Sequence, residues 1–221
     1  MTDMGKDGFL EHNIVAYLET NTTNAKLYAP ILNFLRRSRI MYAISHHHAA
    51  YRSHLMLFWN TAEGVLVNGV RTITANINGA PMSFTVHDVR RLLRFEGELD
   101  EYPTLLPRRL VAGCLMRMGY EGKIPQTGLI KKKFVSPMFK TFFNILIHCL
   151  SPRKGGFDDL HEELQSAAVA LTLNLPYNFS QMIFNYMALN ITSTNKFLLY
   201  PRFIQMIIDD KIPNLPKANA D

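Results

Sequence analysis

Apolar residues are concentrated in residues 136–150, SPMFKTFFNILIHCL, near the middle of the chain. Ser136 suits an N-cap and Pro137 the first helical position, because a serine hydroxyl can accept from a first-turn amide and proline lacks an N–H that would stay unpaired there. Four other polar residues interrupt the run: Lys140, Thr141, Asn144 and His148. Lys140, Asn144 and His148 are spaced four residues apart, so they lie on one face of a helix. The pattern predicts a helix buried on most sides, with one polar stripe facing solvent.

Weaker apolar periodicity predicts further helices elsewhere in the chain. A short alternating segment at 39–44 predicts a strand, and Ser45 is expected to cap the helix that follows it. The predicted helical segments are residues 13–20, 29–37, 45–60, 86–94, 107–118, 158–175, 180–187 and 201–210. The helix at 86–94 opens with Thr85 and Asp88, three residues apart, which predicts a reciprocal capping box.

Residues 65–84 change to the two-residue period of a strand. Asn68-Gly69 and Asn78-Gly79 are pairs that favour type I′ hairpin turns. Two such turns predict three short antiparallel strands, and Pro81 predicts that the last is an edge strand. The chain is therefore expected to be an α+β protein, predominantly α-helical, with about seven or eight helices and this meander in one globule at residues 13–212. Residues 1–12 and 213–221 are expected to be flexible tails.

Charge is unevenly distributed along this 221-residue chain, which has a formal net charge of +6 and 48% hydrophobic residues. Residues 105–140 contain eight Lys or Arg and one acid, Glu121. Such a segment suits nucleic acid or an acidic partner. The candidate contacts are Arg108, Arg109, Lys131, Lys132 and Lys133. A second basic set, Arg90, Arg91 and Arg94, could contact phosphates, but it is expected to form the solvated back of its helix.

The chain carries no pattern of a known active site. It lacks the Gly-rich, HExxH and GxSxG motifs of nucleotide-binding proteins, zinc proteases and hydrolases. Successive histidines on a helix point about 100° apart, so His46, His47, His48 and His54 do not predict a metal site. A hydrolase in an unfamiliar fold would rely on His148 or His161 with nearby acids. We expect no enzyme activity, cofactor, metal or small-molecule substrate.

The two cysteines, Cys114 and Cys149, lie in apolar surroundings, which indicates reduced thiols and an intracellular location, in the cytoplasm or nucleus. The first residues have no apolar core of a signal peptide. The central helix is too short to span a membrane, which takes about 20 apolar residues, so no membrane association is expected.

Several strings in residues 31–212 resemble the N-terminal domain of a group of plant proteins, abundant in the daisy family, that LTR-retrotransposon-like elements encode. The strings are FWNTAEG, VNGVRTITANINGAPMSFTVHDVRRLL, LMRMGYEG, FVSPMFKTFFNILIHCLSPR, YNFSQMIFNYM and KFLLYPRFIQMII. A more distant similarity is to the plant mobile domain. The resemblance implies a Gag-like or ORF1-like origin and supplies no catalytic residues.

These observations lead to two functional hypotheses. The first is a non-enzymatic structural domain of a retrotransposon-derived Gag-like protein that self-associates and contacts RNA or DNA through the basic segment. The alternative is a domesticated, monomeric protein-interaction module with no nucleic-acid role.

Overall fold

The computed structural model describes residues 12–19, 26–152 and 155–216. This part of the chain is mostly helical, as predicted. Its α-helices are α2 (Ala29–Arg36), α3 (Met41–Ser45), α4 (Arg52–Thr61), α5 (Val86–Leu92), α6 (Arg108–Arg117), α7 (Pro137–Leu150), α8 (Glu162–Thr172), α9 (Phe179–Thr192) and α10 (Pro201–Lys211). The strands are β1 (Glu63–Val67), β2 (Val70–Ile77), β3 (Ala80–Phe84), β4 (Ile130–Lys131) and β5 (Asp159–Leu160), and η1 (Lys132–Phe134) is a 3-10 helix. The α+β class, predominantly helical, is confirmed.

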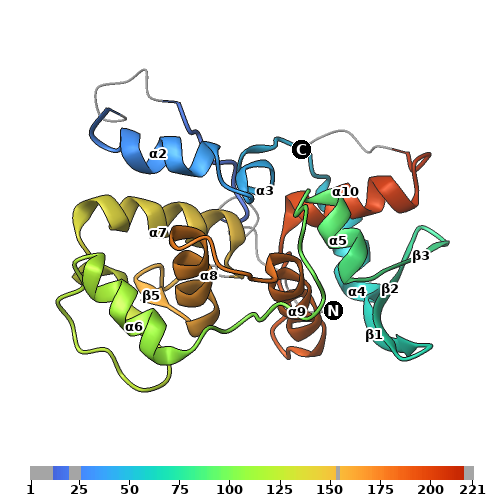
Figure 1. The fold of residues 1–221 in the computed structure, drawn as a ribbon. Coiled ribbons are helices and arrows are strands. Elements are labelled where there is room, and N and C mark those ends of the chain that lie inside the picture. The colour runs from blue at the N-terminus through green and yellow to red at the C-terminus, as the bar shows by residue number, and fades with distance from the viewer. Residues whose placement is uncertain (1–11, 20–25, 153–154, 217–221) are drawn as a thin grey trace.

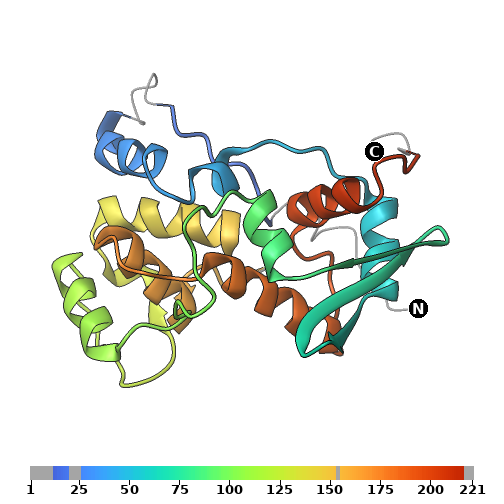
Figure 2. The ribbon, with the colours of Figure 1, turned by 45° about the vertical axis from the view of Figure 1, so that its right-hand side comes forward.

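The elements form two groups that α9 connects (Figure 1). In one group, α2, α3 and α8 pack on α7, and α6 packs on α8. In the other, α4 and α10 cover the three-stranded sheet, and α5 packs on α9 and α10. Figure 2 shows the strands in front of α4, so one sheet face meets that helix and the other faces outward. In the part of the chain that the structure describes, no helix is long and apolar enough to cross a membrane.

The central helix α7 is buried as predicted, but its polar stripe is not fully solvated. Phe142, Phe143, Leu146, Ile147, Cys149 and Leu150 are buried. On the stripe, Asn144 accepts from Lys132 Nζ at 2.5 Å, and the His148 ring lies 4.5 Å from that of Phe157. The stripe is thus half-covered by η1 and the segment that precedes β5. Ser136 occupies the N-cap position and Pro137 the first helical position, as predicted, but the Ser136 side chain does not make the expected capping hydrogen bond.

The meander is confirmed, with strand order β1-β2-β3 and antiparallel pairing throughout. Asn68 and Asn78 have φ of 50° and 53°, and the following glycines have φ of 79° and 87°. Both turn pairs therefore have the positive φ that a type I′ turn requires. Ile73, Ala75 and Ile77 are buried on the sheet face that meets α4.

The predicted helix at residues 13–20 is wrong, because the described residues 12–19 contain no helix. They form an extended segment instead, which we call the N-terminal strap. The Ile14 amide donates to His148 O at 3.1 Å and the Ala16 amide to Ile44 O at 2.8 Å. These bonds to α7 and α3 replace the internal bonds of a helix. His12, which we had assigned to a flexible tail, is buried; residues 1–11 lie outside the described residues.

A buried arginine on α10 holds the strap in place. Arg202 is 4% exposed and donates to four carbonyl oxygens, those of Asn13, Ile14, Ala43 and His46. Burial lowers the pKa of Arg202 to about 10, so the guanidinium remains charged at neutral pH. Among the described residues, backbone carbonyl dipoles balance its charge.

Three other expected elements differ from the sequence predictions. Residues 39–44 were expected to be a strand, but residues 41–45 form α3. The helix expected at 45–60 starts at Arg52, because His46 O binds Arg202 and the Tyr51 amide binds Gln205 Oε1, which holds the segment between them extended. At the C-terminal end, residues 213–216 are not a loose tail: Leu215 packs against the core and Pro216 O lies 3.1 Å from His54 Nε2. Residues 217–221 lie outside the described part.

Candidate functional site

The five basic candidates fall on two elements with different environments. Arg108 and Arg109 begin α6, whereas Lys131, Lys132 and Lys133 lie in β4 and η1. Arg108 serves the fold: its guanidinium donates to Pro125 O at 3.0 and 2.8 Å and to Gln165 Oε1 at 2.5 Å. Gln165 is fully buried. Arg108 therefore fastens the loop after α6 onto α8 and is not free to bind a ligand, while Arg109 is exposed.

The three lysines are also unequal. Lys131 Nζ lies 2.5 Å from Asp159 Oδ1 across the β4–β5 pair. Lys132 is half-buried against Asn144, and burial lowers its pKa. Lys133 is exposed and its Nζ lies 5.1 Å from the centre of the Phe134 ring. Lys133 is thus the lysine of this run best placed to meet a partner.

The structure adds an aromatic residue that the sequence reasoning missed. Phe134 is 40% exposed, and its ring meets that of Tyr120 edge to face at 6.0 Å. A Cβ at Gly122 would lie 2.8 Å from the Phe134 ring, so only glycine lets the loop pass so close. The Glu121 amide donates to Phe134 O at 3.0 Å. These contacts hold the C-terminal end of α6, with exposed Arg117, against η1. We call exposed Arg117, Lys133 and Phe134, together with exposed Arg109 at the other end of α6, the basic-aromatic surface.

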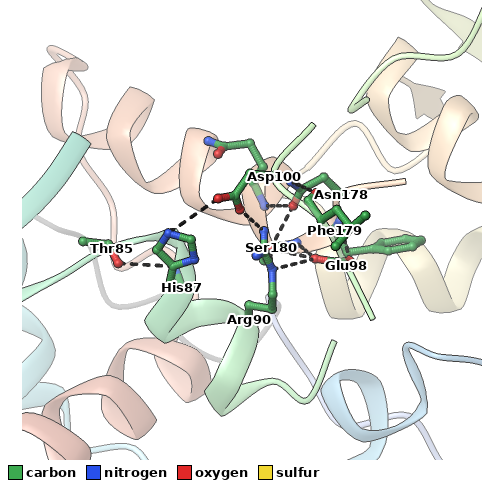
Figure 3. A network of polar contacts seen from close by, with 10 residues as sticks. Thr85, His87, Arg90, Glu98, Asp100, Asn178, Phe179 and Ser180 are labelled. Carbon is green, nitrogen blue, oxygen red and sulfur yellow. Dashed lines mark hydrogen bonds and ion pairs between the residues drawn. The ribbon is translucent and has the colours of Figure 1, made fainter. Parts of the chain in front are cut away.

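A buried carboxylate organises a second polar network (Figure 3). Glu98 accepts from the Phe179 amide at 2.8 Å, the Ser180 amide at 3.1 Å and Ser180 Oγ at 2.7 Å. Asn178 Oδ1 accepts from the Gln181 amide at 2.8 Å. Burial raises the pKa of Glu98, although these bonds and the nearby Arg90 act in the opposite direction. The network satisfies the first amides of α9, and it buries the Ser180 hydroxyl rather than presenting it as a nucleophile.

Of the three arginines in and just after α5, Arg91 and Arg94 are exposed, as expected, whereas Arg90 is half-buried; all three have partners. Arg90 binds Asp100 at 2.8 Å, Arg91 binds Asp210 at 2.6 Å and Arg94 lies 4.1 Å above the Tyr42 ring. Arg90 thus joins α5 to the loop that follows it, whereas Arg91 and Arg94 reach α10 and α3, which are distant in sequence. These contacts compete with any binding of phosphate.

The histidines lie in different environments. His48 Nε2 is 3.0 Å from Asp209 Oδ2, and buried His54 bonds Gln205 Nε2 at 3.1 Å. Among the described residues no three His, Cys, Asp or Glu side chains form a group that could hold a metal ion. His161 and Glu163 line a hollow of about 390 Å³ beside α9, and His148 is not among its lining residues.

The two cysteines are buried free thiols. Burial raises the pKa of both, that of Cys149 to about 12. Because the thiolate is the reactive form, neither is an activated nucleophile.

No protein-family model, curated protein or solved structure matches this chain.

Proposed function

We propose that this chain is a non-enzymatic structural domain, of the Gag-like kind carried by plant retrotransposons, that self-associates and binds single-stranded nucleic acid. The observation that carries the nucleic-acid part is the exposed Phe134 beside Lys133. The sequence resemblance described above supports the Gag-like origin.

The basic-aromatic surface combines two interactions that single strands need. Exposed guanidinium and ammonium groups attract phosphates, and each phosphate contact releases counterions. An exposed aromatic ring stacks on a base whatever its identity, which is worth about 1–3 kcal/mol per base. Duplex DNA keeps its bases stacked internally, so the ring favours single-stranded RNA or DNA. The interaction is expected to depend on salt and only weakly on sequence.

Charge reversal of exposed cations tests this proposal. We expect Arg109→Glu with Lys133→Glu to weaken the binding of a fluorescent single-stranded RNA at least tenfold at about 100 mM salt. Loss of two phosphate contacts should also reduce the slope of log K against log salt by about 1.4. Phe134→Ala should weaken binding about tenfold and leave this slope unchanged, because stacking releases few counterions. Fluorescence anisotropy across a salt series measures both quantities.

The matched control reverses the same charge elsewhere. Arg36 and Arg37, at the end of α2, are exposed, and Arg36→Glu with Arg37→Glu changes net charge by the same amount. If the control weakens binding as much as the test pair, attraction is a property of net charge and the assigned surface is wrong. If the unaltered protein binds no RNA and stays monomeric at every concentration, the proposal falls and the interaction-module alternative takes its place.

A further inference from the structure

The first strand of the meander is a sheet edge: among the described residues β1 pairs only with β2, and α9 lies beside it. All five residues of β1 are exposed, and the large apolar side chains Val65, Leu66, Val67 and Val70 are exposed together on the β1–β2 hairpin. Gly64 has no side chain, so its exposure is that of its backbone. Residues 64–67 hold no proline or charge of the kind that usually blocks an edge. The three strands lie at the end of the molecule away from α2 and α6 (Figure 1).

The register of the hairpin identifies the free backbone groups. Val67 pairs with Val70 across the two-residue turn, which makes this the hydrogen-bonded pair next to the turn. Hydrogen-bonded and non-hydrogen-bonded pairs alternate along an antiparallel ladder. Val65 therefore directs its N–H and C=O toward β2, whereas Gly64 and Leu66 direct theirs outward. The free edge offers two donors and two acceptors.

The opposite edge of the sheet is protected. Pro81 in β3 pairs with Asn76, and the same alternation directs its nitrogen outward, where it has no hydrogen to donate. Helices contact both edge strands, α10 and α5 on β3 and α9 on β1. The difference between the edges is therefore Pro81, which interrupts the outward backbone donors of β3, whereas β1 has no proline.

We propose that β1 is a homodimer interface, where two copies of the chain pair their β1 strands antiparallel around a two-fold axis at Val65. Gly64 of each copy then exchanges both backbone hydrogen bonds with Leu66 of the other, which uses all four outward groups on each strand. Val65 lies opposite Val65 of the second copy, and Val67 lies opposite Glu63 of the second copy. The product is a continuous six-stranded sheet with an isologous interface.

The side chains fit this register. Leu66, which is 72% exposed, lies opposite Gly64 of the second copy, and a Cβ built at Gly64 would meet no atom within 4 Å. Gly64 also borders a groove of about 470 Å³ between the hairpin and α9, with Phe184 and Ala188 among its lining residues. The leucine of one copy therefore lies over open apolar surface on the other.

Charge permits the approach although the chain carries +6 overall. The hairpin is locally neutral, because Glu63 and Arg71 are its only charged residues. The two-fold axis places the two Glu63 residues about 13 Å apart along the strands, four residues at about 3.3 Å each. This exceeds the screening length of about 8 Å at physiological salt, so their repulsion is small. A hairpin-sized contact is below the roughly 800 Å² per partner of stable complexes, so the dimer should be weak and reversible.

This inference rests on the self-association in the proposed function and names the surface that performs it. A cysteine on the two-fold axis tests the register. In a non-hydrogen-bonded antiparallel pair the Cα atoms are about 4.5 Å apart, which a disulfide can bridge. We expect Val65→Cys to give a reducible covalent dimer as the main product of mild oxidation at about 100 µM, read on a non-reducing gel. The native cysteines are both buried and should contribute little background.

Val67→Cys is the matched control. Val67 is more exposed than Val65, at 49% against 37%, so random collision would favour the control. In the proposed register the two control cysteines are about 13 Å apart and cannot join. If Val67→Cys crosslinks as fast as Val65→Cys, or if neither crosslinks, the register is wrong.

Sedimentation of the unaltered protein from about 1 µM to 1 mM tests self-association itself, and variants measured in the same way test whether β1 is the interface. We expect Leu66→Lys to shift the dimer dissociation constant upward at least tenfold, while Leu27→Lys, at 73% exposure outside the sheet, has no effect. If Leu66→Lys dimerises unchanged, the β1 interface is wrong but self-association stands. If the unaltered protein never dimerises, self-association itself is refuted.

Discussion

At the scale of single residues, Glu98 shows how one buried carboxylate can satisfy the free amides at the N-terminus of a helix. Its two oxygens accept from two backbone amides and one hydroxyl at the start of α9. The donors are buried, so without Glu98 they would lose both their partner and access to water. An unsatisfied buried donor costs about 1–3 kcal/mol.

We therefore expect Glu98→Ala to lower the free energy of unfolding by about 3 kcal/mol, measured by urea denaturation. Asp100→Ala is the control, because Asp100 also binds Arg90 but its side chain is 63% exposed. Exposed ion pairs contribute about 0–1 kcal/mol, so the control should change little. Equal losses for the two variants would show that Arg90, and not the α9 amides, accounts for the role of Glu98.

At the scale of elements, the N-terminal strap depends on Asn13. The backbone φ of Asn13 is 56°. Its side-chain Nδ2 donates to Cys149 O at 2.8 Å, and its backbone carbonyl accepts from Arg202. Asn13→Gly keeps the favourable backbone and removes the side-chain bonds, whereas Asn13→Ala loses both. We expect the alanine variant to be less stable than the glycine variant by about 1 kcal/mol, which is the cost of a left-handed conformation for a residue with a Cβ.

Hydrogen exchange gives the local measurement. The Ile14 and Ala16 amides, which bind His148 O and Ile44 O, should lose protection in both variants, and more in the alanine variant. Amides of β2 serve as the internal control. If alanine and glycine behave alike, the strained φ contributes nothing and the side-chain bonds carry the whole effect.

The elements that the sequence predicts well are those whose determinants are local. Asn68-Gly69 and the Thr85–Asp88 box specify a turn and a cap within four residues, and both occur in the structure. The strap was missed because its partners, Cys149 and Arg202, are more than 130 residues away. A helical apolar period at residues 13–20 is also what a partly buried extended segment can show by chance. Short periods near a chain end therefore carry little information about tertiary contacts.

At the scale of the whole molecule, the basic segment shows the same limit for the candidate site. Counting Lys and Arg gave a candidate region, but the count could not separate Arg108, which is bound to Pro125 and Gln165, from exposed Arg109. Phe134 was missed because an aromatic residue in sequence is normally assigned to the core. Its exposure follows from the way Gly122 and Tyr120 pack against it. The local density of positive charge therefore gives a candidate region and does not say which of its residues are exposed.

The network of Asp88, Arg91, Asp210 and Lys211 ties α5 to α10, and it should make the molecule sensitive to acid. Burial raises the pKa of Asp88, but hydrogen bonds from Lys211 and the Thr85 backbone outweigh it, so the net change is downward. The hydrogen bond from Arg91 lowers the pKa of Asp210. An acid with a lowered folded pKa stabilises the protein above its unfolded value, about 3.9, and this contribution is lost as pH falls through the folded value.

We expect the urea midpoint to be constant for this network above about pH 5 and to fall between about pH 5 and pH 2. Asp210→Asn should lower the midpoint at pH 6 and flatten its fall in acid, while exposed Glu121→Gln should leave the profile unchanged. Glu98 acts in the opposite sense, because its raised pKa costs stability as pH rises through the range above about 4.3. The two effects occur in different pH ranges and can be measured separately. If the urea midpoint of Asp210→Asn falls in parallel with that of the unaltered protein below pH 4, this network is not the acid-sensitive contact.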